Sequence, residues 1–343
     1  MSIAVEFDTV SIVFGDSPEK ALPLMDQDQS RSEVQEATGQ VLGVHDCSIS
    51  VEEGEILVLM GLSGSGKSTL LRAVNGLNPV VRGQVRVNDG TGLVDVSHSD
   101  PATLRHLRQH RIAMVFQQFG LLPWRTVRDN VGLGLELAGM PVAERNVQVD
   151  RQLALVGLSD WADNKVSELS GGMQQRVGLA RAFATDAPIL LMDEPFSALD
   201  PLIRTKLQDE LIDLQNELKR TIIFVSHDLD EAFKLGDRIA IMEGGRIVQC
   251  GTPRDIFTNP ANEYVADFVA HMNPLGVLCA RDVMEPASGE YTHIVRPNAD
   301  IHSVMELVKT HDAPVGVAWE DGHVIGQVTS DRVLEKLLDP RGD

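Results

Sequence analysis

The chain has 343 residues, and its 30 Lys and Arg against 50 Asp and Glu give a formal net charge of −20 at pH 7. Because phosphate backbones repel so acidic a chain, the charge argues against a nucleic-acid-coating protein, and no nucleic-acid partner is expected. Hydrophobic residues make up 43% of the chain, which excludes wholesale disorder, and the length favours two domains.

The cysteines, the first residues and the length of the apolar runs indicate the cellular compartment. The three cysteines are scattered and form no CxxC pair, so neither a disulfide framework nor a zinc knuckle is expected, and a reducing cytoplasm fits. The first residues, MSIAVEFDTV, do not form a signal peptide. Apolar runs stay far below the ~18 residues that span a bilayer, so any membrane-spanning part is expected to come from another chain.

The first third of the chain alternates between strand and helix signals. Residues 3–14 predict one or two strands, whereas the polar segment 15–40 predicts a short, largely surface helical insertion. Strand signals return at residue 41 and end in the apolar run 56–60. A Gly/Ser-rich turn and a helix over residues 67–76 follow.

Three later segments are short and nearly all apolar, as strands covered on both faces of a sheet must be. Helical patterns separate them, so we predict a parallel α/β core. A helical subdomain is expected at about 120–185. The three strands are predicted at residues 111–117, 188–194 and 221–227.

The carboxyl-terminal third predicts a hairpin and then a separate module. Residues 238–253 indicate a hairpin that turns at Gly244-Gly245, and a domain boundary is expected within 271–280. We therefore predict one domain over residues 1–272. The segment 281–340 follows the order strand, helix, strand, strand, helix and forms a small module of its own.

A glycine-rich loop between a strand and a helix carries the strongest chemical signal. Its sequence, GLSGSGKS, fits the phosphate-loop pattern GxxxxGK[ST]. Glycines let backbone N–H groups turn inward around phosphate oxygens, the lysine supplies a positive charge, and the final hydroxyl can ligate Mg²⁺. The expected nucleotide contacts are Gly61, Leu62, Ser63, Gly64, Ser65, Gly66, Lys67, Ser68 and Thr69.

Two further sites follow from local patterns. The apolar strand ending in Asp193 and Glu194 delivers both acids to the ligand-binding edge of an open sheet, where Asp193 can hold Mg²⁺ and Glu194 can act as general base. Ser170 is placed to cap a helix that begins with Gly171 and Gly172, which predicts a second anion site.

These motifs, taken together, resemble the ATP-binding cassette family. LSGGMQQR is similar to the family's signature motif, and the phosphate loop and the acidic strand resemble its Walker A and Walker B motifs. The resemblance covers about residues 3–270 and implies ATP and Mg²⁺ as cofactors. It also implies roles for Gln117 (Q-loop, metal and water contact), Asp200 (D-loop), His227 (switch histidine) and Phe14 (adenine stacking).

In this family the nucleotide lies between the phosphate loop of one subunit and the signature motif of another. The resemblance therefore implies a homodimer in which Ser170, Gly171, Gly172 and Gln174 act in trans. It also implies an ATPase bound to permease subunits at the cytoplasmic face of the membrane, served by a substrate-binding protein. A soluble cassette ATPase of DNA repair or translation and a nucleotide-binding regulator without turnover are the alternatives.

The segment 119–131 resembles that of uptake transporters, and the insertion at 15–40 with the segment that follows it resembles the quaternary-amine branch of these transporters. Choline is the expected cargo, with glycine betaine or proline betaine as the alternative. The carboxyl-terminal module resembles a single cystathionine-β-synthase (CBS) motif, although Arg332 stands where the family has its ribose-binding acid. Both a sensor and a dimer-stabilising role remain open for it.

Overall fold

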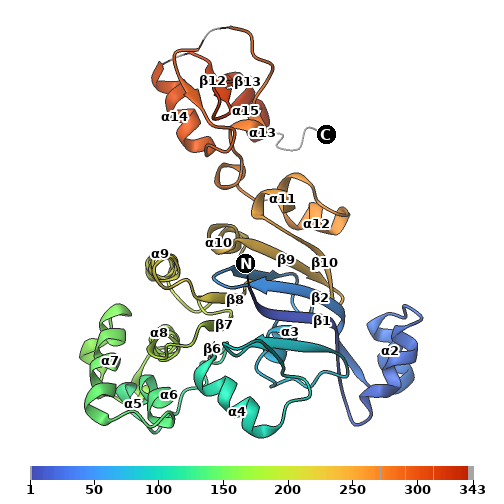
Figure 1. Cartoon of the computed structure of the whole chain (residues 1–343), viewed down its shortest axis with the longest axis vertical. Coiled ribbons are helices and arrows are strands. Elements are labelled where there is room, and N and C mark those ends of the chain that lie inside the picture. The colour runs from blue at the N-terminus through green and yellow to red at the C-terminus, as the bar shows by residue number, and fades with distance from the viewer. Residues whose placement is uncertain (1, 271, 290, 312, 339–343) are drawn as a thin grey trace. The chain divides into compact units, whose positions relative to one another are not determined.

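The computed structural model describes residues 2–270, 272–289, 291–311 and 313–338 (Figure 1). It divides into two compact units. The first runs to His227 and includes Ala240–Val248, and the second comprises Asp228–Ile239 and the chain from Gln249 onward. Each is described separately.

An antiparallel sheet opens the first unit. Its strand order is β2-β1-β4-β5, and every neighbouring pair is antiparallel. Phe14 is the register partner of Val41, so the two ends of the predicted insertion are held side by side by strand pairing. The strands are β1 (Ile3–Phe14), β2 (Val41–Glu52), β4 (Arg82–Asn88) and β5 (Leu93–Asp95).

The second sheet contains the predicted parallel core. Its order is β10-β9-β3-β8-β7-β6, in which β3, β8, β7 and β6 pair in parallel. Every residue of β3, β7 and β8 is buried, which explains their apolar composition. The strands are β3 (Ile56–Met60), β6 (Ile112–Val115), β7 (Ile189–Asp193), β8 (Thr221–Val225), β9 (Arg238–Glu243) and β10 (Arg246–Gly251).

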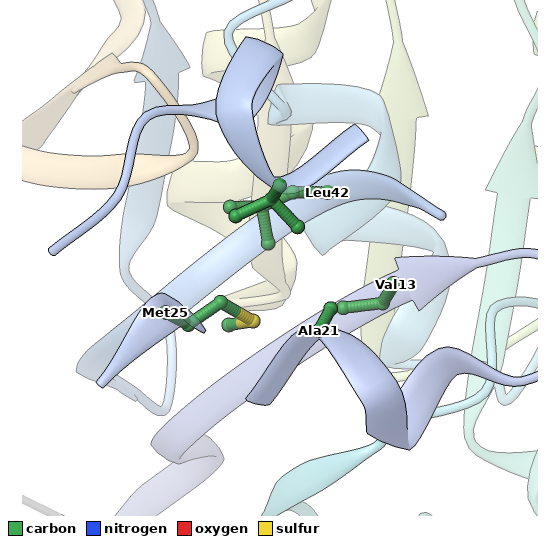
Figure 2. Close-up of a cluster of buried hydrophobic side chains, with 5 residues drawn as sticks. Val13, Ala21, Met25 and Leu42 are labelled. Atoms are coloured by element: carbon green, nitrogen blue, oxygen red, sulfur yellow. The ribbon is translucent and has the colours of Figure 1, made fainter. Parts of the chain in front are cut away.

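The insertion folds as three short helices that share a small core with strands β1 and β2. Val13, Ala21, Met25 and Leu42 lie together there, with Val34 as the fifth buried member (Figure 2). The sequence marks these apolar positions but not their meeting across strands β1 and β2. The helices are η1 (Pro18–Ala21), α1 (Leu22–Met25) and α2 (Arg31–Thr38).

The remaining helices of the first unit include the predicted helical region. Helices α5 to α8 gather together (Figure 1), as the scarcity of strand signals there predicts. The predicted fold class, an α/β cassette with antiparallel and helical additions, is confirmed. The helices are α3 (Lys67–Ala73), α4 (Pro101–His110), α5 (Val127–Val131), α6 (Leu133–Leu137), α7 (Val142–Leu155), η2 (Ser159–Trp161), η3 (Val166–Glu168), α8 (Gly171–Ala184) and α9 (Pro201–Leu218).

The second unit contains a three-stranded sheet in the order β11-β12-β13, flanked by short helices. The succession β11, α14, β12, β13, α15 matches the predicted element order, while the similarity to a CBS motif stays a prediction. Across the described part of the chain, helices are too short or too polar to cross a bilayer. The elements are α10 (Leu229–Leu235), α11 (Pro253–Thr258), α12 (Glu263–Phe268), η4 (Pro274–Gly276), α13 (Ala280–Val283), β11 (Ile294–Val295), α14 (Ile301–His311), β12 (Val315–Ala318), β13 (Val324–Val328) and α15 (Ser330–Leu338).

Candidate active site

The glycine-rich loop joins β3 to α3, as the sequence predicts. Gly61, Gly64 and Gly66 have φ angles of +140°, +79° and +105°, a range that L side chains rarely adopt. A Cβ atom at Gly61 would also lie 2.1 Å from the carbonyl oxygen of Met242. The loop conformation therefore requires glycine at this position.

Lys67 lies inside the loop. Its Nζ donates to the carbonyl oxygens of Gly61 at 2.8 Å and Leu62 at 2.9 Å, and the residue is only 6% exposed. Burial lowers the pKa of this ammonium group, whereas the carboxylates of Glu194 and Asp193 raise it. A cation held this way needs little rearrangement to meet a phosphate oxygen.

A cavity of about 660 Å³ opens beside the loop. The cavity brings together the phosphate loop and the predicted catalytic residues, and its lining residues are up to 213 positions apart in the chain. Phe14, Ser63, Gly64, Gly66, Lys67, Ser68, Thr69, Gln117, Glu194 and His227 all line it.

Asp193 ends strand β7 and is fully buried. Its Oδ1 accepts a 2.6 Å hydrogen bond from the Ser68 hydroxyl, and its Oδ2 accepts hydrogen bonds from Arg72 at 2.8 and 3.2 Å. A carboxylate oxygen and a hydroxyl oxygen thus meet at the edge of the phosphate loop. This oxygen-rich pair fits Mg²⁺, which is usually bound by few side chains together with substrate phosphates.

The side chain of Glu194 is the meeting point of the other predicted catalytic groups. Its Oε2 accepts a 3.0 Å hydrogen bond from Gln117 Nε2 and lies 3.6 Å from His227 Nδ1. Strand β6 ends at Val115, so Gln117 lies in the following turn rather than in the predicted strand. The structure places all three side chains on the wall of one cavity.

The backbone of Glu194 is strained and firmly held. Its φ angle of +49° is unusual for a residue with a side chain, a feature that clusters at active sites. Its N–H donates to Val225 O at 3.1 Å, and its carbonyl accepts from Gln175 Nε2 at 3.1 Å and Ser197 Oγ at 3.0 Å. These hydrogen bonds hold the backbone from which the carboxylate projects.

The signature residues lie at the start of α8. Ser170 caps this helix, accepting from Met173 N at 3.4 Å, as predicted. Gln174 Nε2 donates to Val166 O and Leu169 O at 3.3 and 3.1 Å, and so supports the loop before the helix. These residues do not line the cavity that contains the phosphate loop, so one chain does not bring the two predicted anion sites together.

The two remaining predicted residues have different surroundings. Asp200 caps α9 by accepting from Ile203 N at 3.1 Å. Phe14 is 38% exposed at the end of β1 and lines the cavity. A Cβ at Gly43 would lie 2.9 Å from the Phe14 ring, so this glycine leaves room for the aromatic side chain.

Three residues at the site escaped the sequence analysis. Arg72 pairs with Asp193, and Gln175, 1% exposed, donates to Glu194 O and accepts from Ala198 N at 3.0 Å. Arg31 of the insertion also lines the cavity. Arg72 could have been noticed in the sequence because it lies one helical turn after Ser68. Gln175 and Arg31 gave no such signal, because their contacts are with residues far away in the chain.

Comparison with known proteins identifies the family of this chain. The ABC transporter family model matches residues 44–197. The glycine betaine/proline betaine transport system ATP-binding protein ProV of Escherichia coli (strain K12) is 46% identical to this chain. The alignment covers 100% of this chain and 84% of the ProV sequence. The chain belongs to the ABC transporter family. The sequence resemblance to ATP-binding cassettes is confirmed.

Two further relatives of this ABC protein are informative. The glycine betaine/carnitine transport ATP-binding protein GbuA of Listeria monocytogenes is 48% identical, over 82% of this chain and 70% of GbuA. A dimeric structure of the ATP-binding cassette MJ0796, in a post-hydrolysis state with ADP and Pi, has a TM-score of 0.63 and 30% identity. It covers 73% of this chain and 99% of MJ0796.

Proposed function

We propose that this chain is the ATP-hydrolysing subunit of an importer for a betaine-type quaternary amine. The observation that carries the ATPase proposal is the single cavity that joins the phosphate loop to the carboxylate of Glu194. A buried lysine, a hydroxyl and a carboxylate at one end and a candidate base at the other suit phosphoryl transfer to water. The membership in the ABC transporter family supports the same reaction.

The phosphate end of the site binds and orients. The loop of residues 61–69 would surround the phosphates, and Lys67, which lines the cavity, would meet the β- and γ-phosphate oxygens. Of the predicted contacts, Gly61, Leu62 and Ser65 are not among the residues that line the cavity. Ser68 and Asp193 would hold Mg²⁺, with Gln117 as a further oxygen donor. When bound, this ion would neutralise charge that develops on the phosphate oxygens.

The end of the site that contains Glu194 accepts the proton of the attacking water. Glu194 orients a water and takes its proton as the water oxygen bonds to the γ-phosphorus. The bond from that phosphorus to the bridging oxygen breaks, and ADP retains the electron pair. His227, next to the same carboxylate, steadies the γ-phosphate and the water, and Phe14 stacks on the adenine.

A second copy of the chain completes each site. Each chain has one phosphate loop and one signature helix, and these do not meet within the chain. We infer that the signature residues of one chain bind the nucleotide held by the phosphate loop of the partner, and that Asp200 of the D-loop lies at the same interface. The signature residues are Ser170, Gly171, Gly172 and Gln174. The dimeric form of the relative MJ0796 supports this arrangement. Hydrolysis removes the γ-phosphate that joins the halves, and the dimer opens.

The transported cargo is assigned by likeness. ProV and GbuA are named for glycine betaine with proline betaine or carnitine. This supports the alternative, glycine betaine or proline betaine, better than choline, which the sequence resemblance placed first. The cassette would act at the cytoplasmic face of the membrane, bound to permease subunits that receive cargo from a substrate-binding protein.

Reconstitution tests the proposal. The chain is combined with its permease subunits in vesicles, and ATP hydrolysis is measured with substrate-binding protein loaded with glycine betaine, proline betaine or choline. We expect Mg²⁺-dependent hydrolysis that a betaine stimulates. Absence of hydrolysis would overturn the ATPase proposal, and stimulation by choline alone would restore the original cargo prediction.

A further inference from the structure

The insertion between β1 and β2 reaches the nucleotide cavity through one side chain. Helix α2 begins with a capping box in which Ser30 and Glu33 bond reciprocally. This cap fixes Arg31 at the first helical position. The buried Val34 anchors the same helix in the small core, so Arg31 projects from a supported element.

Arg31 contacts the outside of the phosphate loop. Its Nη1 donates to the carbonyl oxygen of Gly64 at 2.5 Å, and its Nη2 donates to the carbonyl oxygen of Gly43 in β2. Arg31 is also one of the residues that line the cavity, together with Phe14. It therefore joins the insertion, strand β2 and the loop.

The hydrogen bond to Gly64 bears on the direction of the loop's N–H groups. In a trans peptide the C=O of residue 64 and the N–H of residue 65 point in opposite directions. Arg31 donates to the Gly64 carbonyl on one side of this peptide, and the Ser65 N–H on the other side donates to Leu62 O at 3.1 Å. Both sides of the 64–65 peptide are therefore held, and this fixes the conformation of the loop whose other N–H groups would meet the phosphates.

A second contact holds the loop from the β9–β10 turn. Gly245 N donates to Ser65 O at 3.1 Å, and a Cβ at Gly245 would lie 2.6 Å from Arg31 Nη2. Asp28 of the insertion pairs at 2.7 Å with Arg246, the residue that follows the turn and begins β10. The insertion and the turn thus enclose one side of the loop.

We propose that Arg31 is a positioning residue for the nucleotide: it fixes the outer face of the phosphate loop and places a permanent positive charge beside the triphosphate. The insertion then determines the affinity for ATP, while Glu194 determines the rate of cleavage. A guanidinium suits this role because its planar donors hold two carbonyl oxygens at once and stay charged. The inference rests on the proposed ATP site.

The test compares three variants of the full chain. Arg31→Ala removes both hydrogen bonds and the charge. Arg31→Lys keeps the charge but lacks the planar pair of donors that reaches two carbonyl oxygens at once. Lys20→Ala, the control, removes an exposed cation of the insertion. Binding of a fluorescent ATP analogue gives Kd, and steady-state hydrolysis with permease subunits gives KM and kcat. Thermal melting reports folding.

We expect Arg31→Ala to raise Kd and KM about tenfold or more, with kcat within about twofold, because a charge-assisted contact is lost. Arg31→Lys is expected to lie between Arg31→Ala and the wild type, and Lys20→Ala to match the wild type. If Arg31→Ala does not fold, Arg31→Lys must still raise Kd without lowering kcat.

Two outcomes overturn the inference. Either Kd and KM stay at wild-type values in the Arg31 variants, or kcat alone falls in proportion to a loss of folded protein, as a merely structural role would require. In both cases the wild type still binds and hydrolyses ATP, so the proposed function stands. A wild type that binds no nucleotide would refute the proposed function itself.

Discussion

Replacing Glu194 with Gln tests the assigned base most directly. The change removes the negative charge but keeps the side-chain length. Gln117 Nε2, 3.0 Å away, still finds a carbonyl oxygen to which it can donate. The strained backbone at φ +49° is held by main-chain hydrogen bonds, which the substitution leaves intact. Folding should therefore be unaffected.

The expected loss lies in the chemical step. A positioned general base contributes about 10²–10⁴-fold to a rate, which corresponds to ~3–5 kcal/mol in the barrier. Binding should change little, because Lys67 donates to the carbonyl oxygens of Gly61 and Leu62 and not to Glu194. We expect kcat to fall by this factor while Kd for ATP stays within about threefold, and ATP to trap a closed dimer.

Steady-state hydrolysis, equilibrium ATP binding and light scattering with Mg²⁺-ATP measure the three quantities. Glu144→Gln, an exposed position on α7, serves as the matched control and should resemble the wild type. Hydrolysis at the wild-type rate in Glu194→Gln would refute the assignment of the base. A loss of ATP binding with the rate constant unchanged would show that the carboxylate acts in binding instead.

Three further predictions follow from buried groups. Lys67→Ala should weaken ATP binding at least about tenfold, because the phosphates lose their buried cation, and a binding titration measures it. Met25→Ala should destabilise the insertion by about 2–5 kcal/mol, seen as faster hydrogen exchange over residues 31–38, with exposed Glu36→Ala as control. Burial alone would raise the pKa of Asp282, but hydrogen bonds from Arg254 and Cys279 lower it overall. Wild-type stability should therefore fall as the pH drops below about 4, and Asp282→Asn should flatten this dependence in denaturant melts.

Much of the site could be predicted because its parts are local in sequence. The glycine loop needs left-handed backbone at Gly61, Gly64 and Gly66, and that requirement is visible as a motif. The buried strands β3 and β7 are recognisable in the sequence as apolar runs, and each is followed by polar residues at the ligand-binding edge of the sheet. Ser170 is likewise readable as a helix cap.

Contacts between distant segments could not be read in this way. Arg31 resembles any surface arginine until α2 packs and its guanidinium meets the Gly64 carbonyl, 33 positions later. Gln175 resembles an ordinary helical residue until the fold brings it to the carbonyl of Glu194.

The loop, the strands and the chemical types of the site residues could be predicted from local sequence, because they follow from backbone preference, hydrophobic period and motif. Tertiary structure alone decided which donor meets which acceptor. Such pairings depend on strand register and helix packing, which arise only when segments far apart in the chain bury their apolar faces together.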